Sequence, residues 1–291
     1  MHANRPLFVV GCSRSGTTLV QSLLATSDRL LALPETNRLY AVADDLDRRR
    51  FGHVGGVRRV LRDRLRGLYN RAGLTRKFDW SKNVDKLPQA LGDEVRRRAL
   101  GRERSIARIY TQFGEMLDAV AGDRRWVEKS PQNIFVLDLI ERHFAQPQFV
   151  HIVRSPLDNI ASLVDAARKY STFGERFGGA NGLVKAVRYY NRALSCSVAR
   201  RGADGHLILR YEALAADVDR HLRRLEAFLG LPADSLHPVY DTTDIVKDHE
   251  VWKRNSRAIR PASSKAHEVF TAEQIAYVER HALDPDRWFP V

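Results

Sequence analysis

The stretch LFVVGCSRSGTTLVQSLL, at residues 7 to 24, joins an apolar run, a glycine-containing turn and a run of helix-forming residues. The apolar residues 7 to 11 predict a buried strand, and residues 17 to 26 predict the helix after it. Gly16, at the junction, permits close approach of the backbone to a ligand. A strand, a glycine-rich turn and a helix N-terminus together form an anion site, because backbone N–H groups converge there and the helix dipole favours negative charge.

The turn differs from the P-loop of an ATP-binding protein. In that loop a lysine reaches the β- and γ-phosphates, and the Ser or Thr after it binds magnesium. Here Gly16 is followed by Thr17 and Thr18, and Arg14 lies inside the turn. The sequence therefore predicts a site for a phosphate or sulfate group that Arg14 neutralises, and it disfavours a triphosphate bridged by a metal.

Strands and helices alternate along the chain, which predicts an α/β fold with a mostly parallel sheet flanked by helices. No repeat, low-complexity segment or linker divides residues 1 to 291, so we expect a single domain that binds a nucleotide in a P-loop-like manner. The further strands are expected at residues 29–33, 125–130, 148–153 and 206–211, and the further helices at 36–47, 57–71, 104–121, 133–144, 156–168, 180–200, 217–229 and 271–283. Residues 72–92 have little periodicity and are expected to form a loop.

The composition bounds the partners and the location. The formal net charge of +13 attracts anions, although a compositional bias towards arginine explains it equally well. No run of about 18 apolar residues is present, so no membrane span is expected. The apolar run from Leu7 to Val10 is too short for a secretory signal, so we expect a cytoplasmic protein. Cys12 and Cys196 are far apart and no cluster has metal-ligand spacing, so we predict neither a disulfide nor a metal.

The segment CSRSGTTL resembles the loop that binds the 5′-phosphosulfate in sulfotransferases that use 3′-phosphoadenosine 5′-phosphosulfate (PAPS). The arginine version of the loop is similar to that of the tyrosylprotein sulfotransferases and related bacterial enzymes. The resemblance implies that the cofactor is bound by Arg14, Ser15, Gly16, Thr17 and Thr18, and that adenosine 3′,5′-bisphosphate is the product, with no metal.

The segment FVHIVRSPLDNIASL, at residues 149 to 163, resembles the 3′-phosphate motif of the same family. Arg154 leaves the end of a strand and Ser162 lies two turns into the following helix, so both can converge on one phosphate. The family often has Asp and Arg where this chain has Ser155 and Leu157, a departure that does not affect the pair itself.

Two further segments supply candidate catalytic residues. Glu35, in ALPETNRLY, matches the position of the general base in the tyrosylprotein branch, where a carboxylate at a strand end takes the proton of the acceptor. Lys129, in WVEKSPQN, resembles the lysine that contacts the sulfuryl group or the bridging oxygen, and Arg14 completes the set. Glu128 and Asn133 are expected to orient this turn. The structural alternatives are an N-cap or salt-bridge role for Glu35 and a surface lysine on a turn.

Two weaker similarities lie downstream. LRYEAL resembles a family segment whose tyrosine approaches the cofactor, which nominates Tyr211; a buried tyrosine at a strand end is the alternative. RPASSKAHEVFTAEQIAYV resembles the segment before the last helix of the family, which nominates Ser264 and Lys265 as cofactor contacts.

The resemblance implies transfer of a sulfuryl group to a hydroxyl of a small metabolite, lipid or glycan. This acceptor is either anionic or neutral. Residues 41–124 match no motif and are expected to form a helical acceptor-side or lid region. The basic face of the expected helix at 57–71 is either solvated or docks an anionic acceptor. An ATP-dependent small-molecule kinase is the alternative enzyme. A nucleic-acid binder has only the charge in its favour, since no binding motif accompanies it.

Overall fold

The computed structural model describes residues 5–47, 73–241, 245–246 and 265–291. The helix expected at residues 57–71 and the candidate cofactor contact Ser264 lie outside these ranges. The other candidate site residues lie within them.

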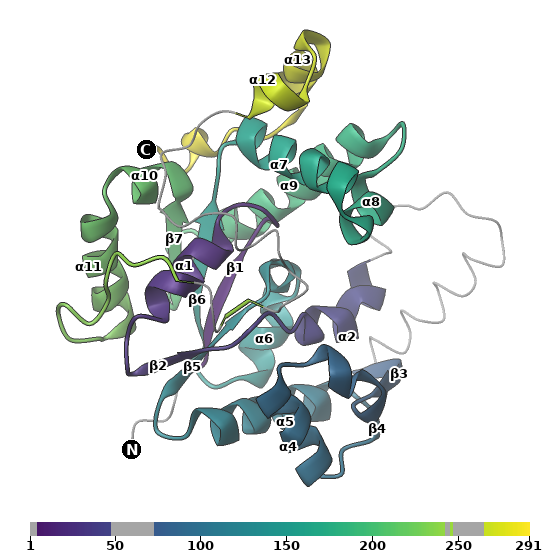
Figure 1. The fold of residues 1–291 in the computed structure, drawn as a ribbon, viewed down its shortest axis with the longest axis vertical. Coiled ribbons are helices and arrows are strands. Elements are labelled where there is room, and N and C mark those ends of the chain that lie inside the picture. Colours follow the sequence, from purple (N-terminus) through teal and green to yellow (C-terminus); the bar gives the residue numbers. More distant parts are fainter. Residues whose placement is uncertain (1–4, 48–72, 242–244, 247–264) are drawn as a thin grey trace.

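A five-stranded parallel sheet forms the centre of the fold (Figure 1). Its strands, in spatial order, are β2 (Leu30–Ala32), β5 (Arg125–Lys129), β1 (Leu7–Gly11), β6 (Gln148–Val153) and β7 (His206–Arg210). All neighbouring pairs are parallel, with Val9 beside Lys129 and Gly11 beside Ile152. The predicted α/β fold with a mostly parallel sheet is confirmed.

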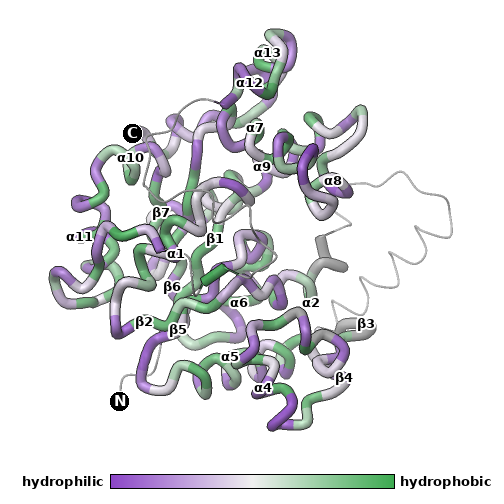
Figure 2. The backbone as a smooth tube through the Cα atoms, viewed as in Figure 1, coloured by the Kyte–Doolittle hydropathy of each residue, from purple (hydrophilic) through white to green (hydrophobic). Residues whose placement is uncertain are grey.

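Helices cover both faces of this sheet, because side chains alternate between the faces along each strand. Leu7 and Val9 pack on one face with α1 (Thr17–Leu24), α10 (Tyr211–Ala216) and α11 (Val218–Leu229). Phe8 and Val10 pack on the other face with α5 (Ile106–Ala121), α6 (Leu137–His143) and α9 (Gly182–Val198). Figure 2 shows the hydrophobic residues of the strands enclosed between these layers. Both faces of the sheet are therefore packed against helices, and these hold the strand ends.

The remaining helices are α2 (Arg38–Asp47), α4 (Gln89–Arg97), α7 (Pro156–Lys169), α8 (Ser171–Phe177), α12 (Ala266–Val269) and α13 (Ala272–His281), with 3₁₀ turns at Ser81–Lys86, Pro131–Phe135 and Pro285–Arg287. Local signals explain several of their limits. The Ser155 side chain caps α7 by accepting the N–H of Asp158, and Gly230 ends α11 in a left-handed conformation. Thr271 and Gln274 form a capping box at the start of α13.

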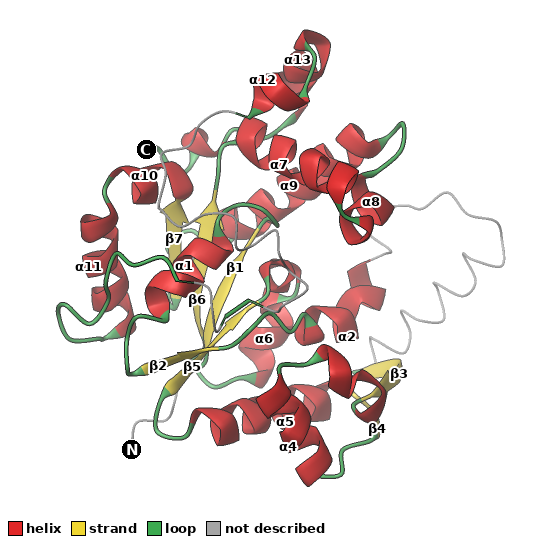
Figure 3. Cartoon of the chain, viewed as in Figure 1, coloured by secondary structure: helices red, strands yellow, loops and turns green. Residues whose placement is uncertain are grey.

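The prediction of a loop at residues 72–92 is wrong. β3 (Leu74–Asp79) lies there and pairs in an antiparallel two-stranded sheet with β4 (Arg102–Ser105), and α4 begins at Gln89 (Figure 3). The sequence does not indicate these strands, because LTRKFD and RERS are highly charged and show no regular alternation of apolar and polar residues. The buried ring of Trp80 packs edge-on against Phe78 and anchors this small sheet to the core.

Smaller corrections concern the limits of elements. The strand expected at 206–211 ends at Arg210, and Tyr211 opens α10. The helix expected at 133–144 begins at Leu137, because a 3₁₀ turn that starts at Pro131 precedes it. The seven-residue helix α8 was not expected, since it is too short to show helical periodicity.

In the described part of the chain, no helix is long and apolar enough to cross a membrane. The same residues contain no group of three or more His, Cys, Asp or Glu side chains placed to hold a metal ion. In the described structure, Cys12 and Cys196 are not joined to each other by a disulfide.

Candidate functional site

The carboxyl ends of the five parallel strands meet at one edge of the sheet, and each is followed or ended by a candidate residue. Arg14 follows β1, Glu35 follows β2, Lys129 ends β5, Arg154 follows β6 and Tyr211 follows β7. Ligands of parallel α/β sheets bind at this edge. The topology therefore gathers side chains that are widely separated in the sequence.

The loop between β1 and α1 depends on Gly16. Gly16 has φ 107° and ψ 14°, a conformation that L side chains rarely adopt. A Cβ atom at this position would lie 2.5 Å from Cδ2 of Tyr211, so the tyrosine ring packs directly on the loop. Arg14 has φ 72°, which for a residue other than glycine costs about 1–3 kcal/mol. The surrounding structure must compensate for this strain, as is common where a loop is shaped for a ligand.

The start of α1 offers donors for an anion. The first N–H groups of a helix have no partners within it, and here they belong to Thr17 and the residues after it. The N–H of Ser15 does not join them, because it donates to the carbonyl oxygen of Cys12 over 3.1 Å and closes the turn. The Ser15 hydroxyl is buried and has no hydrogen-bond partner among the described residues. An orphaned hydroxyl beside a helix N-terminus fits an anionic group such as a phosphate or sulfate.

Arg14 points from the loop towards α7. Its Nε donates a hydrogen bond to Oγ of Ser162 over 3.2 Å. Burial lowers the pKa of the Arg14 guanidinium, and the nearby positive charge of Arg154 lowers it further. Two arginines and one hydroxyl therefore lie close together, and the shared phosphate contact of Arg154 and Ser162 stays a prediction. Such a concentration of positive charge is stabilised by an anion between its members.

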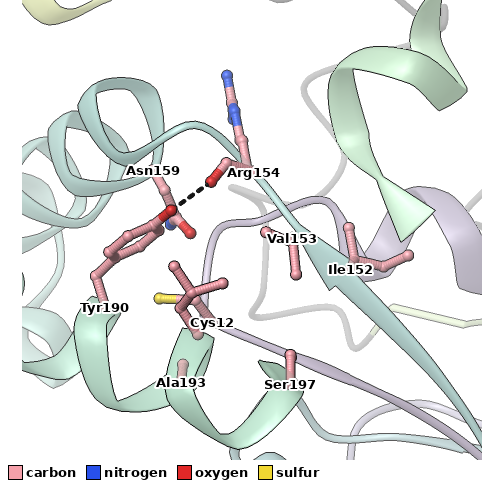
Figure 4. Close-up of a pocket in the computed structure, with 9 residues that line it drawn as sticks. Cys12, Ile152, Val153, Arg154, Asn159, Tyr190, Ala193 and Ser197 are labelled. Atoms are coloured by element: carbon pink, nitrogen blue, oxygen red, sulfur yellow. Dashed lines mark hydrogen bonds between the residues drawn. The ribbon is translucent and has the colours of Figure 1, made fainter. Parts of the chain in front are cut away.

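Arg154 is held from both sides. Its guanidinium carbon lies 4.7 Å from the centroid of the Tyr211 ring, a cation–π contact. Its carbonyl oxygen accepts a hydrogen bond from the Tyr190 hydroxyl over 2.8 Å. Figure 4 shows the side chain pointing away from the small cavity beside Cys12 and Tyr190. Nε of Arg154 is buried and, within the described structure, has no hydrogen-bond partner, which makes it a second orphaned donor at this site.

Glu35 and Lys129 form an ion pair at the other side of the edge. Nζ of Lys129 donates to Oε2 of Glu35 over 2.8 Å, and Nδ2 of Asn37 donates to Oε1 over 2.7 Å. The lysine side chain is 1 % exposed and the glutamate side chain 13 %. Low exposure strengthens the attraction between the two opposite charges. The ion pair is compatible with a proton-accepting role for Glu35 and with the purely structural alternative, whereas Lys129 is not a surface lysine.

Lys265 lies on another segment of the chain. It is exposed at the N-terminus of α12, and α12 packs against α7, where Nη2 of Arg168 donates to the carbonyl oxygen of Val269 over 3.0 Å. No hydrogen bond or ion pair joins Lys265 to the loop within the described residues. Its predicted role as a cofactor contact stays a prediction, as does that of Ser264.

A model of the sulfotransferase family matches residues 6–235 of this chain. The match contains the loop, Glu35, Lys129, the Arg154–Ser162 pair and Tyr211. The chain belongs to the sulfotransferase family. Membership gives it a place among enzymes that transfer sulfate groups, and it confirms the resemblance inferred from the four sequence segments.

Solved structures show the same fold in other sulfotransferases. The sulfotransferase domain from the curacin biosynthetic pathway is 18 % identical, with a TM-score of 0.61 over 96 % of this chain and 98 % of that one. STF9 from Mycobacterium avium is 16 % identical, with a TM-score of 0.52 over 96 % and 76 %. Mouse SULT7A1, complexed with PAP, is 12 % identical, with a TM-score of 0.50 over 95 % and 82 %. No match was found among the curated proteins.

Sequence reasoning missed two contacts that shape the site of this sulfotransferase. The hydroxyls of Ser13 in the loop and Tyr189 in α9 lie 2.9 Å apart, and the Glu212 carboxylate accepts the N–H of Ser155 over 2.7 Å. Tyr189 lies in a regular helix without any distinguishing local pattern. Glu212 stands next to Tyr211 in the segment LRYEAL. A charged residue at the end of a predicted strand is the sequence feature that could have indicated its role.

Proposed function

We propose that this sulfotransferase transfers a sulfuryl group from PAPS to a hydroxyl of a small metabolite, lipid or glycan, with Glu35 as the general base. The observation that carries the proposal is the arrangement of one sheet edge. The β1–α1 loop with Arg14 lies next to Arg154, which follows β6. A buried Glu35–Lys129 pair lies at the ends of β2 and β5. The PAP bound to mouse SULT7A1, a protein of the same fold, supports PAPS as the donor.

The donor would be bound in two parts. The loop residues Arg14, Ser15, Gly16, Thr17 and Thr18 hold the 5′ end, with the orphaned Ser15 hydroxyl as one of the donors. Arg154 and Ser162 hold the 3′-phosphate. Bound PAPS supplies an activated sulfuryl group, whose bond to a 5′-phosphate oxygen breaks while the acceptor oxygen bonds to sulfur. Tyr211 keeps the loop and Arg154 in place, and Ser264 and Lys265 remain candidate contacts of the same nucleotide.

Glu35 receives the proton that the acceptor hydroxyl loses. A carboxylate within hydrogen-bond reach of the acceptor can take this proton as the new bond to sulfur forms. Lys129 stays protonated and, with Arg14, balances the negative charge that grows on the sulfuryl and leaving-group oxygens. Positioning and charge stabilisation suffice for such in-line transfers, because the protein forms no covalent intermediate.

The acceptor side is assigned to residues 41–124. Its described part includes residues 41–47 of α2, the β3–β4 sheet, α4 and α5, and these share one hydrophobic core cluster with Phe8 and Val10 of β1. The expected basic helix at 57–71 belongs to this region. If it attracts an anionic acceptor, reversing the charges of Arg58, Arg62 and Arg66 raises the acceptor KM and flattens its dependence on salt.

Calorimetric titration tests the donor site. Adenosine 3′,5′-bisphosphate and 5′-AMP are titrated in EDTA into the wild type, Arg154→Ala and, as a control, Arg188→Ala on the exposed side of α9. We expect the wild type and the control to prefer the bisphosphate, and Arg154→Ala to bind it about 10- to 100-fold more weakly, since a hydrogen bond to a charged group contributes about 1.5–3 kcal/mol. Equal or absent binding of both nucleotides to the wild type would overturn the proposal.

A further inference from the structure

Glu128, the neighbour of Lys129 in β5, is a buried carboxylate without a role in the transfer just described. It is 2 % exposed. Its Oε1 accepts hydrogen bonds from the hydroxyls of Thr36 over 2.7 Å and Ser130 over 2.6 Å, and its Oε2 accepts one from Nδ2 of Asn133 over 2.7 Å. A charge is tolerated in the interior when hydrogen bonds replace its water. The donors here come from the segment after β2 as well as from the turn after β5.

Two of these hydrogen bonds lead towards Glu35. Thr36 directly follows Glu35, and the N–H of Asn37 donates to the Ser130 hydroxyl over 2.8 Å. The segment that carries the base is therefore attached at two consecutive residues to the strand end that carries Lys129. Asn37 has φ 55°, a left-handed conformation that asparagine adopts more readily than most residues other than glycine.

The carboxylate also fixes the direction of the network. An ionised carboxylate can only accept hydrogen bonds, so the hydroxyl hydrogens of Thr36 and Ser130 must point at Glu128. The lone pairs of Ser130 are then free to accept the N–H of Asn37. Burial raises the pKa of Glu128, and the hydrogen bonds from Ser130 and Thr36 oppose this rise. The network therefore orients the donors around Glu128.

We propose that Glu128 is a positioning residue, which holds Glu35 at hydrogen-bond distance from Lys129 through Thr36 and Ser130. This inference rests on the proposed function, in which Glu35 takes the proton and Lys129 balances the charge. Glu128 acts through these side chains and not on the reacting atoms. The parallel ladder of β2 and β5 ends at Ala32 beside Val127, and the cross-links through Thr36 and Ser130 continue this alignment to Glu35 and Lys129.

Two substitutions separate the hydrogen bonds of Glu128 from its charge. In Glu128→Gln, Oε1 can still accept from Thr36 and Ser130, while Nε2 needs an acceptor at Asn133. Oδ1 of Asn133 is buried and has no hydrogen-bond partner in the described structure, so a flip of the Asn133 amide supplies that acceptor. Glu128→Gln therefore keeps the network and removes the charge, whereas Glu128→Ala removes both.

Thr36→Val removes one link between Glu128 and the Glu35 segment, and Thr26→Val is its matched control. The Thr36 hydroxyl donates to Glu128 and accepts the N–H of Arg38 over 3.4 Å. The Thr26 hydroxyl likewise donates once, to the carbonyl oxygen of Leu23 over 2.6 Å, and accepts once, from the N–H of His237 over 2.9 Å. Both changes delete the same group, but Thr26 follows the end of α1 that is remote from the loop.

The test compares the wild type with Thr36→Val, Thr26→Val, Glu128→Gln and Glu128→Ala. Turnover is measured as release of adenosine 3′,5′-bisphosphate from PAPS, with water as the acceptor. The affinity for the bisphosphate is measured by calorimetry. The position of Glu35 relative to Lys129 is determined in crystal structures of the wild type and Thr36→Val. We expect Thr36→Val and Glu128→Ala to lower the turnover rate by about 10- to 100-fold through misplacement of Glu35, with Kd within about twofold of wild type. Glu128→Gln recovers most of the rate lost in Glu128→Ala, and Thr26→Val changes neither rate nor affinity.

Three results would overturn or reassign this inference. Wild-type turnover in Thr36→Val, with Glu35 still on Lys129 in its crystal structure, would remove the positioning role. A turnover rate for Glu128→Gln as low as that of Glu128→Ala would show that the charge of Glu128, and not its hydrogen bonds, supports turnover. If Glu128→Ala does not fold, Thr36→Val and Glu128→Gln decide the question. If the wild type neither binds the bisphosphate nor releases it from PAPS, the proposed function is overturned. The crystal structure of Thr36→Val still tests the positioning role in that case, because Glu35 is expected to move away from Lys129.

Discussion

Nε of Arg14 and Oγ of Ser162 lie 3.2 Å apart and join the β1–α1 loop to the middle of α7. The two residues are 148 positions apart in the chain. They meet because β1 and β6 are neighbours in the sheet, and the loop and α7 both leave its carboxyl edge. Through this contact the proposed sites for the 5′ end and the 3′-phosphate of the nucleotide become one connected surface.

Removal of the Ser162 hydroxyl is expected to weaken this surface without abolishing it. Ser162→Ala deletes one acceptor for Arg14 and one donor for the 3′-phosphate, so bisphosphate affinity falls about 5- to 30-fold, corresponding to about 1–2 kcal/mol. The affinity for 5′-AMP, which lacks that phosphate, falls less. Calorimetry of both nucleotides checks this, with Ser195→Ala in α9 as the control; Ser195 donates only to the carbonyl oxygen of Asn191 among the described contacts. Equal losses for the two nucleotides would contradict the assignment of Ser162.

Replacement of Glu35 by glutamine separates the base from the ion pair. The amide oxygen of Glu35→Gln can still accept from Lys129, so the local geometry is kept, but the side chain cannot take a proton at neutral pH. We expect turnover of PAPS to fall about 10²- to 10⁴-fold, the usual contribution of a general base, with bisphosphate binding unchanged. Glu279→Gln on α13 serves as the control. Near wild-type turnover in Glu35→Gln would leave Glu35 with the structural role alone.

Gly16 is expected to tolerate no side chain. In Gly16→Ala the new Cβ would lie 2.5 Å from the Tyr211 ring, in addition to the strain of φ 107°. Gly202→Ala introduces comparable backbone strain at φ 72°, and nothing lies within 4 Å of its Cβ. Both variants should lose about 1–3 kcal/mol of unfolding free energy, but only Gly16→Ala should lose bisphosphate binding. Thermal unfolding and calorimetry together check this, and retained binding in Gly16→Ala would show that the loop adapts.

Much of the fold and of the site followed from local signals. Apolar runs of strand length alternating with helical periods predicted the five parallel strands, and the rule for parallel sheets placed their polar ends together. Arg14, Glu35, Lys129, Arg154 and Tyr211 each stand at such an end, so their gathering was predictable from the sequence. Arg154 and Ser162 belong to one strand–helix unit, so their spacing could be read from the sequence, while their shared contact with a phosphate stays a prediction.

The cross-links between distant segments could not be predicted in the same way. The Thr36–Glu128 hydrogen bond spans 92 positions and the Ser13–Tyr189 contact spans 176. Neither leaves a periodic trace, because each depends on which strands become neighbours and on how two loops approach. The β3–β4 sheet was missed for a different reason: its stability comes from contacts such as Phe78 on Trp80 and not from the pattern of its own charged strands.

A chain of hydrogen bonds behind the site links two buried imidazoles. Ser197 Oγ lies 3.1 Å from Nδ1 of His151, Nε2 of His151 lies 2.9 Å from Nδ1 of His206, and Nε2 of His206 lies 3.2 Å from Glu141. If His206 donates to Glu141, its Nδ1 accepts from His151, which in turn accepts from Ser197. This single arrangement satisfies every group with both imidazoles neutral. Arg200, which also binds Glu141, adds positive charge that opposes protonation.

This chain of imidazoles predicts that stability falls as the pH is lowered. Burial lowers the pKa of both His151 and His206 below their ordinary value of 6.5, while the unfolded chain protonates normally. The unfolded state therefore binds more protons than the native state as the pH falls through 6.5. The free energy of unfolding then falls until the native pKa is reached, by at most about 1.4 kcal/mol per pH unit for each imidazole. Above pH 6.5 both states are neutral and this effect vanishes. Thermal unfolding between pH 8 and pH 5 should show a shallower loss in His151→Gln than in the wild type or in His267→Gln, whose imidazole is exposed. Identical pH profiles for all three proteins would show that the native structure protonates His151 without cost.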